Sequence, residues 1–313
     1  MSIVEATAQL SVWGPITLFF IGFISNFSNM IIFVGVKTFR QSPSTFYIMG
    51  QSITNLGALI MILLQSIPST SGSASSVSCK LIMYFSQVTA PAAMSFLWLS
   101  AFDRWACTSR STRIRKLSSN HIASRLFLFP FVFWSLICIP YFLFCDLVPP
   151  TFNCIYTNEI FAQVSLYFLD PLVAAIFPLI ILIIFGILTY QNIFGVTRVH
   201  QDLVRTRLSI TRLSTWEQQM TKMMISQTLL TILCTLPRAI FFIYIMAIIN
   251  EIAMKSVDEL EIIYFMNQFT AFIFGINFAL SFYIFLLFSP RFRQTIKTHL
   301  KCQFHLTNNQ VAP

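Results

Sequence analysis

The sequence predicts an all-α membrane protein, a bundle of seven transmembrane helices followed by a short amphipathic surface helix. Three observations lead to this fold class. The 313 residues are 56% hydrophobic and only 10% charged, whereas a soluble domain carries about 25% charged residues. Seven apolar runs are each long enough to cross a bilayer, which takes roughly 20 residues. Basic residues gather in alternate connections between these runs, as the topology of a membrane protein requires.

The apolar runs define the predicted helices and the domain organisation. They lie near residues 10–36, 45–67, 77–106, 122–145, 163–194, 218–249 and 261–288. Because lipid offers no hydrogen-bond partners, the backbone of each run has to bond internally, and we expect helices. Prolines inside the runs are expected to kink them; these are Pro91, Pro140, Pro178 and Pro237. We divide the chain into an extracellular N-terminus (1–9), the bundle (10–288) and a cytoplasmic tail (289–313).

The charges predict the orientation. Seventeen of the 20 basic residues fall in the first, third and fifth connections and in the tail, while Lys80 and Lys255 lie on the opposite side and Arg238 lies inside the sixth run. Eight of the 11 acidic residues lie on or near that opposite side. Since Lys and Arg bias a loop toward the cytoplasm, we expect an extracellular N-terminus, a cytoplasmic C-terminus and a location in the plasma membrane.

The tail predicts a helix that lies on the membrane surface. Between Ser289 and His305, apolar residues recur at helical spacing with basic residues between them, a pattern typical of an interfacial helix in contact with membrane lipids. Cys302 near its end is a candidate for palmitoylation, and a plain cytosolic cysteine is the alternative.

Several function classes lack support in the sequence. The seven cysteines contain no CxxC pair and no Cys/His metal spacing, and we expect no metal site and no cofactor. We find no phosphate-binding loop and no nucleophile motif, and we therefore expect no catalytic residues and no enzyme activity. The net charge of +9 comes from short loops and not from one concentrated patch, so nucleic acid is not an expected partner.

A group of motifs with ordered spacing identifies a family. Asp103-Arg104-Trp105 ends the third run and resembles the Asp-Arg-Tyr motif of rhodopsin-like G-protein-coupled receptors, with Trp for Tyr. Cys79 lies 25 residues before Arg104, at the spacing of the family's outer disulfide cysteine. Further matches in order are Asn26, Asn55 in Ser-Ile-Thr-Asn-Leu, Trp134, Pro178, Glu217, Cys234-Thr-Leu-Pro237, and the worn Asn277 to Phe285 segment. The chain resembles a divergent, orphan member of this family over nearly its whole length.

The resemblance implies a switch formed by Asp103, Arg104 and Glu217. Glu217 lies 20 residues before Pro237, where many family members place an acid that faces the arginine. An Arg104–Glu217 pair would hold the third and sixth helices together until activation frees a cleft for the G protein. The alternative is an ordinary arginine at the cytoplasmic edge. Intramembrane ionisable residues are functional by default, which favours the switch.

The resemblance also implies an extracellular disulfide and a polar chain through the bundle. Cys79 is expected to pair with Cys154, with Cys145 as the competitor, because Cys154 lies mid-loop on the oxidising side. The polar chain is expected to contain Asn26, Asn55, Asn277 and Ser281; simple packing is the alternative. The family carries a carboxylate at the Asn55 position that helps hold sodium, so we expect weak or no sodium regulation here.

The ligand pocket is expected among the outer halves of the helices. Candidates are Ser86, Asp170 and Arg238. Arg238 either meets an anionic group such as a peptide carboxylate or pairs with Asp170, since buried charges are usually paired. Ser86 stands where amine receptors carry Asp, and Gly275 stands where opsins carry the retinal lysine, which disfavours both classes. A short peptide or a small molecule remains.

The leading hypothesis is therefore a receptor that binds an extracellular ligand and activates a heterotrimeric G protein through a conformational change of the bundle. Pro178 and Pro237 are expected to bend the fifth and sixth helices. Two alternatives stay open. A channel or transporter would need charged residues along a midplane path, and only Arg238 and Asp170 are available. A degenerate receptor that no longer couples is compatible with the worn sixth and seventh motifs.

Overall fold

The computed structural model describes residues 2–40, 42–67, 75–109, 111–148, 153–203, 215–248, 255–290 and 292–298. Only the backbone is described for residues 37–38, 153, 193–203 and 215–216. Cys302, which was considered for palmitoylation, and the distal half of the predicted surface helix lie outside the described residues.

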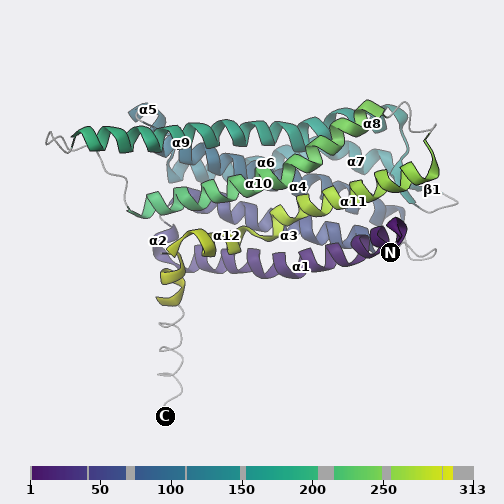
Figure 1. Ribbon diagram of the computed structural model, residues 1–313, viewed down its shortest axis with the longest axis horizontal. Coiled ribbons are helices and arrows are strands. Elements are labelled where there is room, and N and C mark those ends of the chain that lie inside the picture. Colours follow the sequence, from purple (N-terminus) through teal and green to yellow (C-terminus); the bar gives the residue numbers. More distant parts are fainter. Residues whose placement is uncertain are drawn as a thin grey trace, which may run out of the picture.

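Long helices make up the bundle, and they run side by side (Figure 1). They are α1 (Ile3–Gly35), α3 (Ser44–Ser66), α4 (Ser76–Thr108), α6 (Asn120–Ile137) with α7 (Ile139–Phe144), α8 (Glu159–Val164) with the π-helix η1 (Ser165–Ile176) and α9 (Phe177–Leu203), α10 (Thr215–Ile248), and α11 (Val257–Ala279) with α12 (Ser281–Phe288). Two single-turn helices, α2 (Lys37–Arg40) and α5 (Thr112–Arg115), lie in connections. The predicted fold class, a seven-helix membrane bundle, is confirmed.

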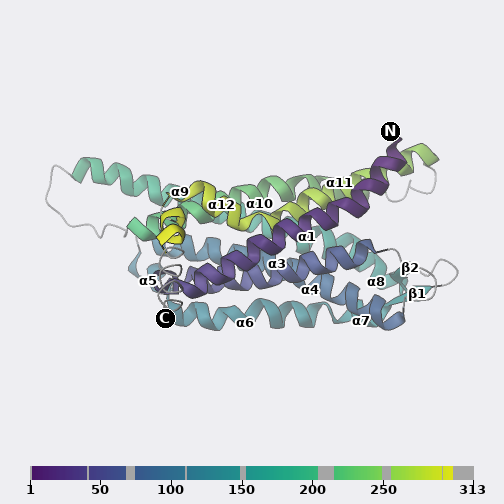
Figure 2. The same ribbon diagram turned by 90° about the horizontal axis from the view of Figure 1, so that it is seen from below.

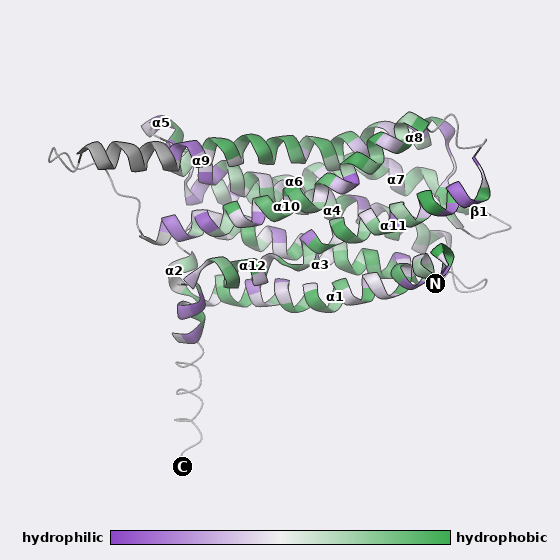
Figure 3. Cartoon of the chain, in the orientation of Figure 1, coloured by the Kyte–Doolittle hydropathy of each residue, from purple (hydrophilic) through white to green (hydrophobic). Residues whose placement is uncertain are grey.

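Six of these segments are long and apolar enough to cross a membrane by themselves, and α4 is the seventh. It has 33 residues, enough for about 50 Å of helix at 1.5 Å per residue. Polar residues lower the hydropathy of α4. They are tolerated because the helix packs against α3, α6, α7, α9 and α10 and faces protein more than lipid. Figure 3 shows that hydrophobic residues predominate along most of the long helices.

Close contacts fix α4 in the centre. A Cβ atom at Gly50 of α3 would lie 2.3 Å from the Phe96 ring of α4, so only glycine permits this approach of the two helices. On the other side, the Trp134 Nε1 of α6 donates a hydrogen bond of 2.8 Å to Ser95 Oγ. The tryptophan that sequence comparison singled out in the fourth span therefore anchors α6 to α4.

The two ends of the bundle carry different groups. We call the end that holds Asp103 and Arg104, near α2 and α5, the Arg104 end, and the opposite end, near the N-terminus and the β-strands, the Cys79 end. Figure 2 shows that α1 crosses the bundle obliquely between these ends. The helix begins at Ile3, ahead of the apolar run, because Ser2 caps it and accepts a hydrogen bond from the Glu5 N–H.

Three of the predicted spans are irregular. The fourth is interrupted at Cys138, two residues before Pro140, which lacks the N–H that would continue the helix. The fifth contains η1, whose i→i+5 hydrogen bonds widen the helix, and Pro178 is the second residue of α9 directly after it. The seventh is interrupted at Leu280.

The interruption of the seventh span has no proline or glycine to cause it. The freed N–H of Phe282 is instead satisfied from the first helix, because it donates a hydrogen bond of 3.1 Å to Ser25 Oγ. Asn29 of α1 donates a second bond, of 2.9 Å, to Ser281 Oγ. Polar side chains of α1 therefore stabilise the start of α12.

A β-hairpin covers the Cys79 end. Strands β1 (Cys145–Val148) and β2 (Asn153–Tyr156) pair in antiparallel fashion, and a disulfide joins Cys154 to Cys79 in the first turn of α4. Lys80 forms an ion pair of 3.3 Å with Asp146. A hydrogen bond from the Ser76 side chain, the Leu147 N–H and the Lys80 charge hold the pKa of Asp146 below its usual range.

Residues 292–298 are helical and turn across the bundle axis at the Arg104 end (Figure 1). Phe292 is fully buried and contacts Phe33, Phe39 and Phe285. Arg293 is exposed. The described part of the predicted amphipathic helix thus has one buried apolar face and one exposed basic face.

Candidate functional site

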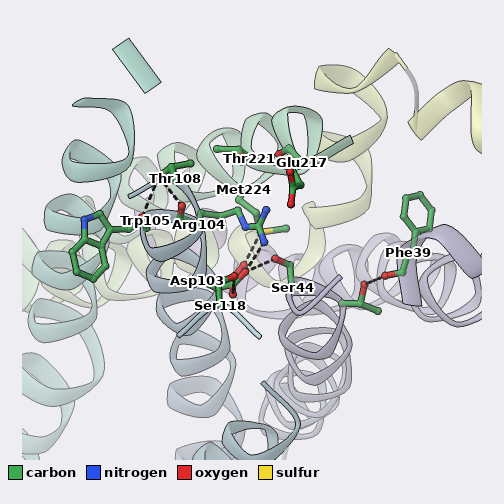
Figure 4. A network of polar contacts seen from close by, with 12 residues as sticks. Phe39, Ser44, Asp103, Arg104, Trp105, Thr108, Ser118, Glu217, Thr221 and Met224 are labelled. Carbon is green, nitrogen blue, oxygen red and sulfur yellow. Dashed lines mark hydrogen bonds and ion pairs between the residues drawn. The ribbon is translucent and has the colours of Figure 1, made fainter. Parts of the chain in front are cut away.

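Asp103 and Arg104 form a buried ion pair at the last turns of α4. Their side chains are only 2% and 3% exposed. Asp103 Oδ2 also accepts a hydrogen bond of 2.8 Å from Ser44 Oγ, at the start of α3. Its Oδ1 accepts one of 2.6 Å from Ser118 Oγ, in the connection between α5 and α6. The carboxylate therefore joins three parts of the chain (Figure 4).

Arg104 is incompletely satisfied. Its Nη2 contacts Asp103, while its Nε and Nη1 are buried and have no hydrogen-bond partner among the described residues. A buried group left unpaired costs more than an ordinary hydrogen bond contributes. The guanidinium is thus held by one partner in a place where a second partner would stabilise it further.

Glu217, the third residue of the predicted switch, lies in the first turn of α10. Its carboxylate is close enough to attract Arg104 electrostatically, and Figure 4 places it beyond the guanidinium on the side away from Asp103. The structure thus brings all three residues together, with Asp103 as the direct partner of the arginine. An Arg104–Glu217 lock in another state of the bundle stays a prediction.

The space beside the ion pair is filled by soft apolar side chains. Met220, Met223 and Met224 of α10 are buried and pack in one cluster with aromatic residues of α1, α12 and the C-terminal segment. Ser100 Oγ of α4 contacts Met224 Sδ at 2.7 Å. Unbranched methionine side chains adapt readily to new packing, so α10 meets α4 through a surface that can rearrange.

The four residues of the predicted polar chain are all buried, but they belong to three separate groups. Asn55 Nδ2 donates to Asn26 Oδ1 over 3.0 Å, and Asn26 Nδ2 donates to the Phe278 carbonyl over 2.9 Å. Asn277 accepts from Thr231 of α10, and Ser281 accepts from Asn29. The Asn26 group joins α1, α3 and α11. The Asn277 group joins α10 and α11 and also contacts α4 through Met94, and the Ser281 group joins α1 and α12.

Arg238, in the half of α10 nearer the Cys79 end, is held by α11. Its Nη1 donates to Asn267 Oδ1 over 2.7 Å, to the Asn267 carbonyl over 3.0 Å and to Thr270 Oγ1 over 3.2 Å. Its guanidinium also lies 4.4 Å from the centre of the Phe242 ring, within the range of a cation–π contact.

Asp170 lies in η1 and takes other partners. Tyr141 donates to its Oδ1 over 3.2 Å and Ser165 donates to its Oδ2 over 3.1 Å. Asp170 attracts Arg238 electrostatically, but within the described residues the two form no ion pair. The structure therefore does not contain the direct Arg238–Asp170 pair that was considered as one alternative. Ser86, the third pocket candidate, is half-buried on α4.

A groove of about 600 Å³ lies between α10 and α11 beside Arg238. Thr270, a partner of Arg238, lines it together with Pro237 and Phe241. Its other lining residues include Leu233 and Ile240, which are 60% and 59% exposed. The groove therefore opens on the outer surface of the bundle, where lipid would lie.

Several residues of these sites were not anticipated from the sequence. Ser44 and Ser118 complete the Asp103 site, Asn267 holds Arg238, and Tyr141 and Ser165 bind Asp170. None belongs to a motif with a distinctive spacing. Each is a small or aromatic polar residue in or next to an apolar run, and only its placement in three dimensions shows its partner.

The helical bundle and its buried ion pair define the class of the protein as a seven-helix membrane protein. The model of the seven-transmembrane receptors of the rhodopsin family matches residues 25–280. The comparison with curated proteins yields no significant match. Because the family match covers most of the chain, from the last third of α1 to the residue after α11, the protein belongs to the rhodopsin family of seven-transmembrane receptors.

Proposed function

We propose that this multi-pass membrane protein is a plasma-membrane receptor whose Arg104 end faces the cytoplasm and whose Cys79 end faces the exterior. A ligand that enters at the Cys79 end favours a state in which the Arg104 end of α10 moves away from α4. A heterotrimeric G protein then binds the exposed surface. The excess of basic residues at the Arg104 end supports this orientation.

The observation that carries the proposal is the unsatisfied guanidinium of Arg104. In the part of the chain that the structure describes, Nε and Nη1 lack partners while α10 packs against α4. Displacement of α10 gives the N–H groups of these two nitrogens access to the carbonyl groups of a protein partner. The conformational change needs no ligand at the Arg104 end; it requires only that the extracellular ligand bind one state of the bundle more tightly than the other.

Structural features of α10 support such a movement. Pro237 lies inside the helix and removes one backbone hydrogen bond, which favours a hinge there. The methionine cluster supplies adaptable packing between the hinge and the end of the helix. The polar group around Asn26 holds α1, α3 and α11 together, which makes these helices the fixed part of the bundle.

The extracellular ligand is proposed to be a small molecule or short peptide with an anionic group that binds Arg238. Within the described residues, the hydrogen bonds that hold the guanidinium all use Nη1, and Nε and Nη2 are proposed to meet the ligand. Asp170 accepts hydrogen bonds from hydroxyl groups and, within the described residues, forms no ion pair with the Arg238 guanidinium. The arginine is thus oriented by neutral partners and keeps its charge for recognition.

Nucleotide exchange tests the function directly. The receptor is reconstituted in lipid nanodiscs with purified G proteins of each class, and GTP-analogue uptake is measured with and without candidate ligands. We expect at least one class to exchange faster with receptor than with empty nanodiscs. If no class responds while vesicles containing the protein pass ions or solutes, a transport function replaces the receptor proposal.

The anionic-ligand proposal predicts a charge requirement at position 238. A ligand screen through a promiscuous G protein should return acids, and their methyl esters should be weaker. Arg238→Gln should lower the affinity for the acid about 10- to 100-fold, because it removes a charge-assisted hydrogen bond. The measurement is the ligand concentration at half-maximal exchange.

Two variants serve as controls for this prediction. Arg238→Lys keeps the charge and should retain part of the affinity. Leu229→Ala changes another α10 side chain, which faces outward away from the groove, and should retain all of it. Equal affinity of acid and ester for the unaltered receptor would contradict an anionic ligand at Arg238.

A further inference from the structure

The groove between α10 and α11 has an apolar lining. Nine of its eleven lining residues are apolar, and Tyr244 and Thr270 each add one hydroxyl group. On α10 the lining extends from Leu233 to Tyr244, which corresponds to about 16 Å of helix at 1.5 Å per residue. The volume of about 600 Å³ is typical of a small-molecule site. The groove is therefore elongated and apolar, and its shape is compatible with a hydrocarbon chain.

A cation lies against the inner wall of this groove. Arg238 stands midway along the stretch of α10 that lines it, and Phe241 and Thr270 belong to the lining. The Arg238 Nη1 donates a hydrogen bond of 3.2 Å to Thr270 Oγ1, and its guanidinium carbon lies 5.8 Å from the centre of the Phe241 ring. Thr270 is buried. The guanidinium is therefore in direct contact with the residues that form the inner wall.

The charge of Arg238 has no direct counter-ion within the described residues. Its hydrogen-bond partners, Asn267 and Thr270, are neutral, and Asp170 attracts it without forming an ion pair. A cation at membrane depth is costly unless it is paired. An anion that reached the guanidinium from the groove would lower this cost, and to occupy the groove it would need an apolar body.

We propose that the groove binds the hydrocarbon chain of a fatty acid, and that the carboxylate of this ligand accepts hydrogen bonds from Arg238. This inference rests on the proposed function, because it specifies the chemical class of the anionic ligand at Arg238. The groove lies in the half of α10 nearer the Cys79 end. In the proposed orientation this half is next to the outer leaflet, from which a fatty acid reaches the groove.

The two parts of the ligand contribute differently. Lipid tails are as apolar as the groove, so moving a chain from the bilayer into the groove contributes little selectivity. The carboxylate supplies the selectivity, because hydrogen bonds to a charged group are about twice as strong as neutral ones. The chain concentrates the ligand in the bilayer and places it along the groove. A neutral lipid lacks the first part, and a small soluble acid lacks the second.

The test uses the full-length receptor in nanodiscs of phosphatidylcholine and a photoreactive analogue of palmitate. Mass spectrometry maps the cross-links, which should fall in residues 233–244 of α10 and 262–270 of α11, the two stretches that line the groove. Unlabelled palmitate, its methyl ester and butyrate then compete with the probe. The ester should compete at least about ten-fold more weakly than the acid, because it lacks the charge that Arg238 binds. Butyrate should not compete.

Three variants locate the site. Arg238→Gln should lower the affinity for palmitate to that of the ester. Ile240→Trp places a large side chain in the groove and should lower the affinity about ten-fold, the effect of overfilling a packed site. Ile243→Trp is the matched control, because Ile243 is 54% exposed on the same helix and lies outside the lining. Its affinity for palmitate should equal that of the unaltered receptor.

Equal competition by palmitate and its ester would overturn the proposal, because the groove would then hold ordinary membrane lipid. Competition by butyrate equal to that of palmitate, or an equal loss in both tryptophan variants, would also overturn it. The comparison of acid with ester uses the unaltered receptor, so it is decisive even where a variant fails to fold. None of these measurements uses a G protein. A receptor that binds palmitate as expected but catalyses no nucleotide exchange would contradict the proposed function and not this site, whereas exchange stimulated through Arg238 by a soluble acid, without palmitate binding, would contradict the site alone.

Discussion

Arg104→Gln is expected to reduce ligand-stimulated nucleotide exchange on the cognate G protein at least about ten-fold, equivalent to about 1.4 kcal/mol. Glutamine is too short to extend from α4 and has no positive charge, so it cannot supply the N–H groups that Arg104 leaves unpaired in the closed bundle. Exchange is measured at saturating ligand, with receptor expression checked by an antibody tag.

A second variant separates this effect from simple misfolding. Glu217→Gln removes the electrostatic attraction between α10 and Arg104 and should raise basal exchange about two- to five-fold, the effect of one weak surface attraction. The two substitutions therefore act in opposite directions on the same switch. If both variants bind ligand and both exchange at the level of the unaltered receptor, the ion pair has no role in coupling.

The disulfide at the Cys79 end has the second large expected effect. Cys79→Ser, Cys154→Ser and the double variant should each lower the free energy of unfolding by about 2–5 kcal/mol, because a bond that closes a long loop restricts the unfolded chain. The cysteines are 75 residues apart in the sequence. Thermal unfolding in detergent, followed by thiol-reactive dye or circular dichroism, measures the change.

Agreement among these variants is the internal check. Since the double variant removes the same bond as either single one, its loss should match theirs and not their sum. Cys107→Ser alters a free, half-buried cysteine and should leave the midpoint nearly unchanged. A clearly larger loss in the double variant would show that the two cysteines act independently and would contradict the pairing.

The sequence predicts most of the fold because lipid imposes one strong rule. A run of apolar residues of sufficient length must form a helix, so the positions of the spans follow from the apolar runs, of which α4 is the least apolar. The cysteine pair follows from the family spacing of Cys79 and the place of Cys154 in the next loop. The interruptions within the helices are harder to predict from the sequence. Pro140 signals the interruption at Cys138, but the interruption at Leu280 depends on Ser25, a residue more than 250 positions away.

The candidate site was predicted only in part, because some of its residues belong to a family motif and others do not. Asp103, Arg104 and Glu217 are recognisable because their spacing matches a family motif. Their hydrogen-bond partners Ser44 and Ser118 come from other segments of the chain, and serine is too common for its position to be informative. Asp170 and Arg238 are both identifiable as charges within apolar runs, but only the structure assigns each of them a separate set of partners.

The composition of α4 has a consequence for biosynthesis. As an isolated segment it does not satisfy the apolarity that its six companions reach, and the insertion machinery of the membrane selects segments by that property. Its ion pair and hydroxyl groups become tolerable in lipid only when α3 and α6 already shield them. Partition of this segment into the bilayer is therefore coupled to its assembly with earlier and later segments, and substitutions at the contacts of α4 will affect the yield of mature protein as well as its signalling.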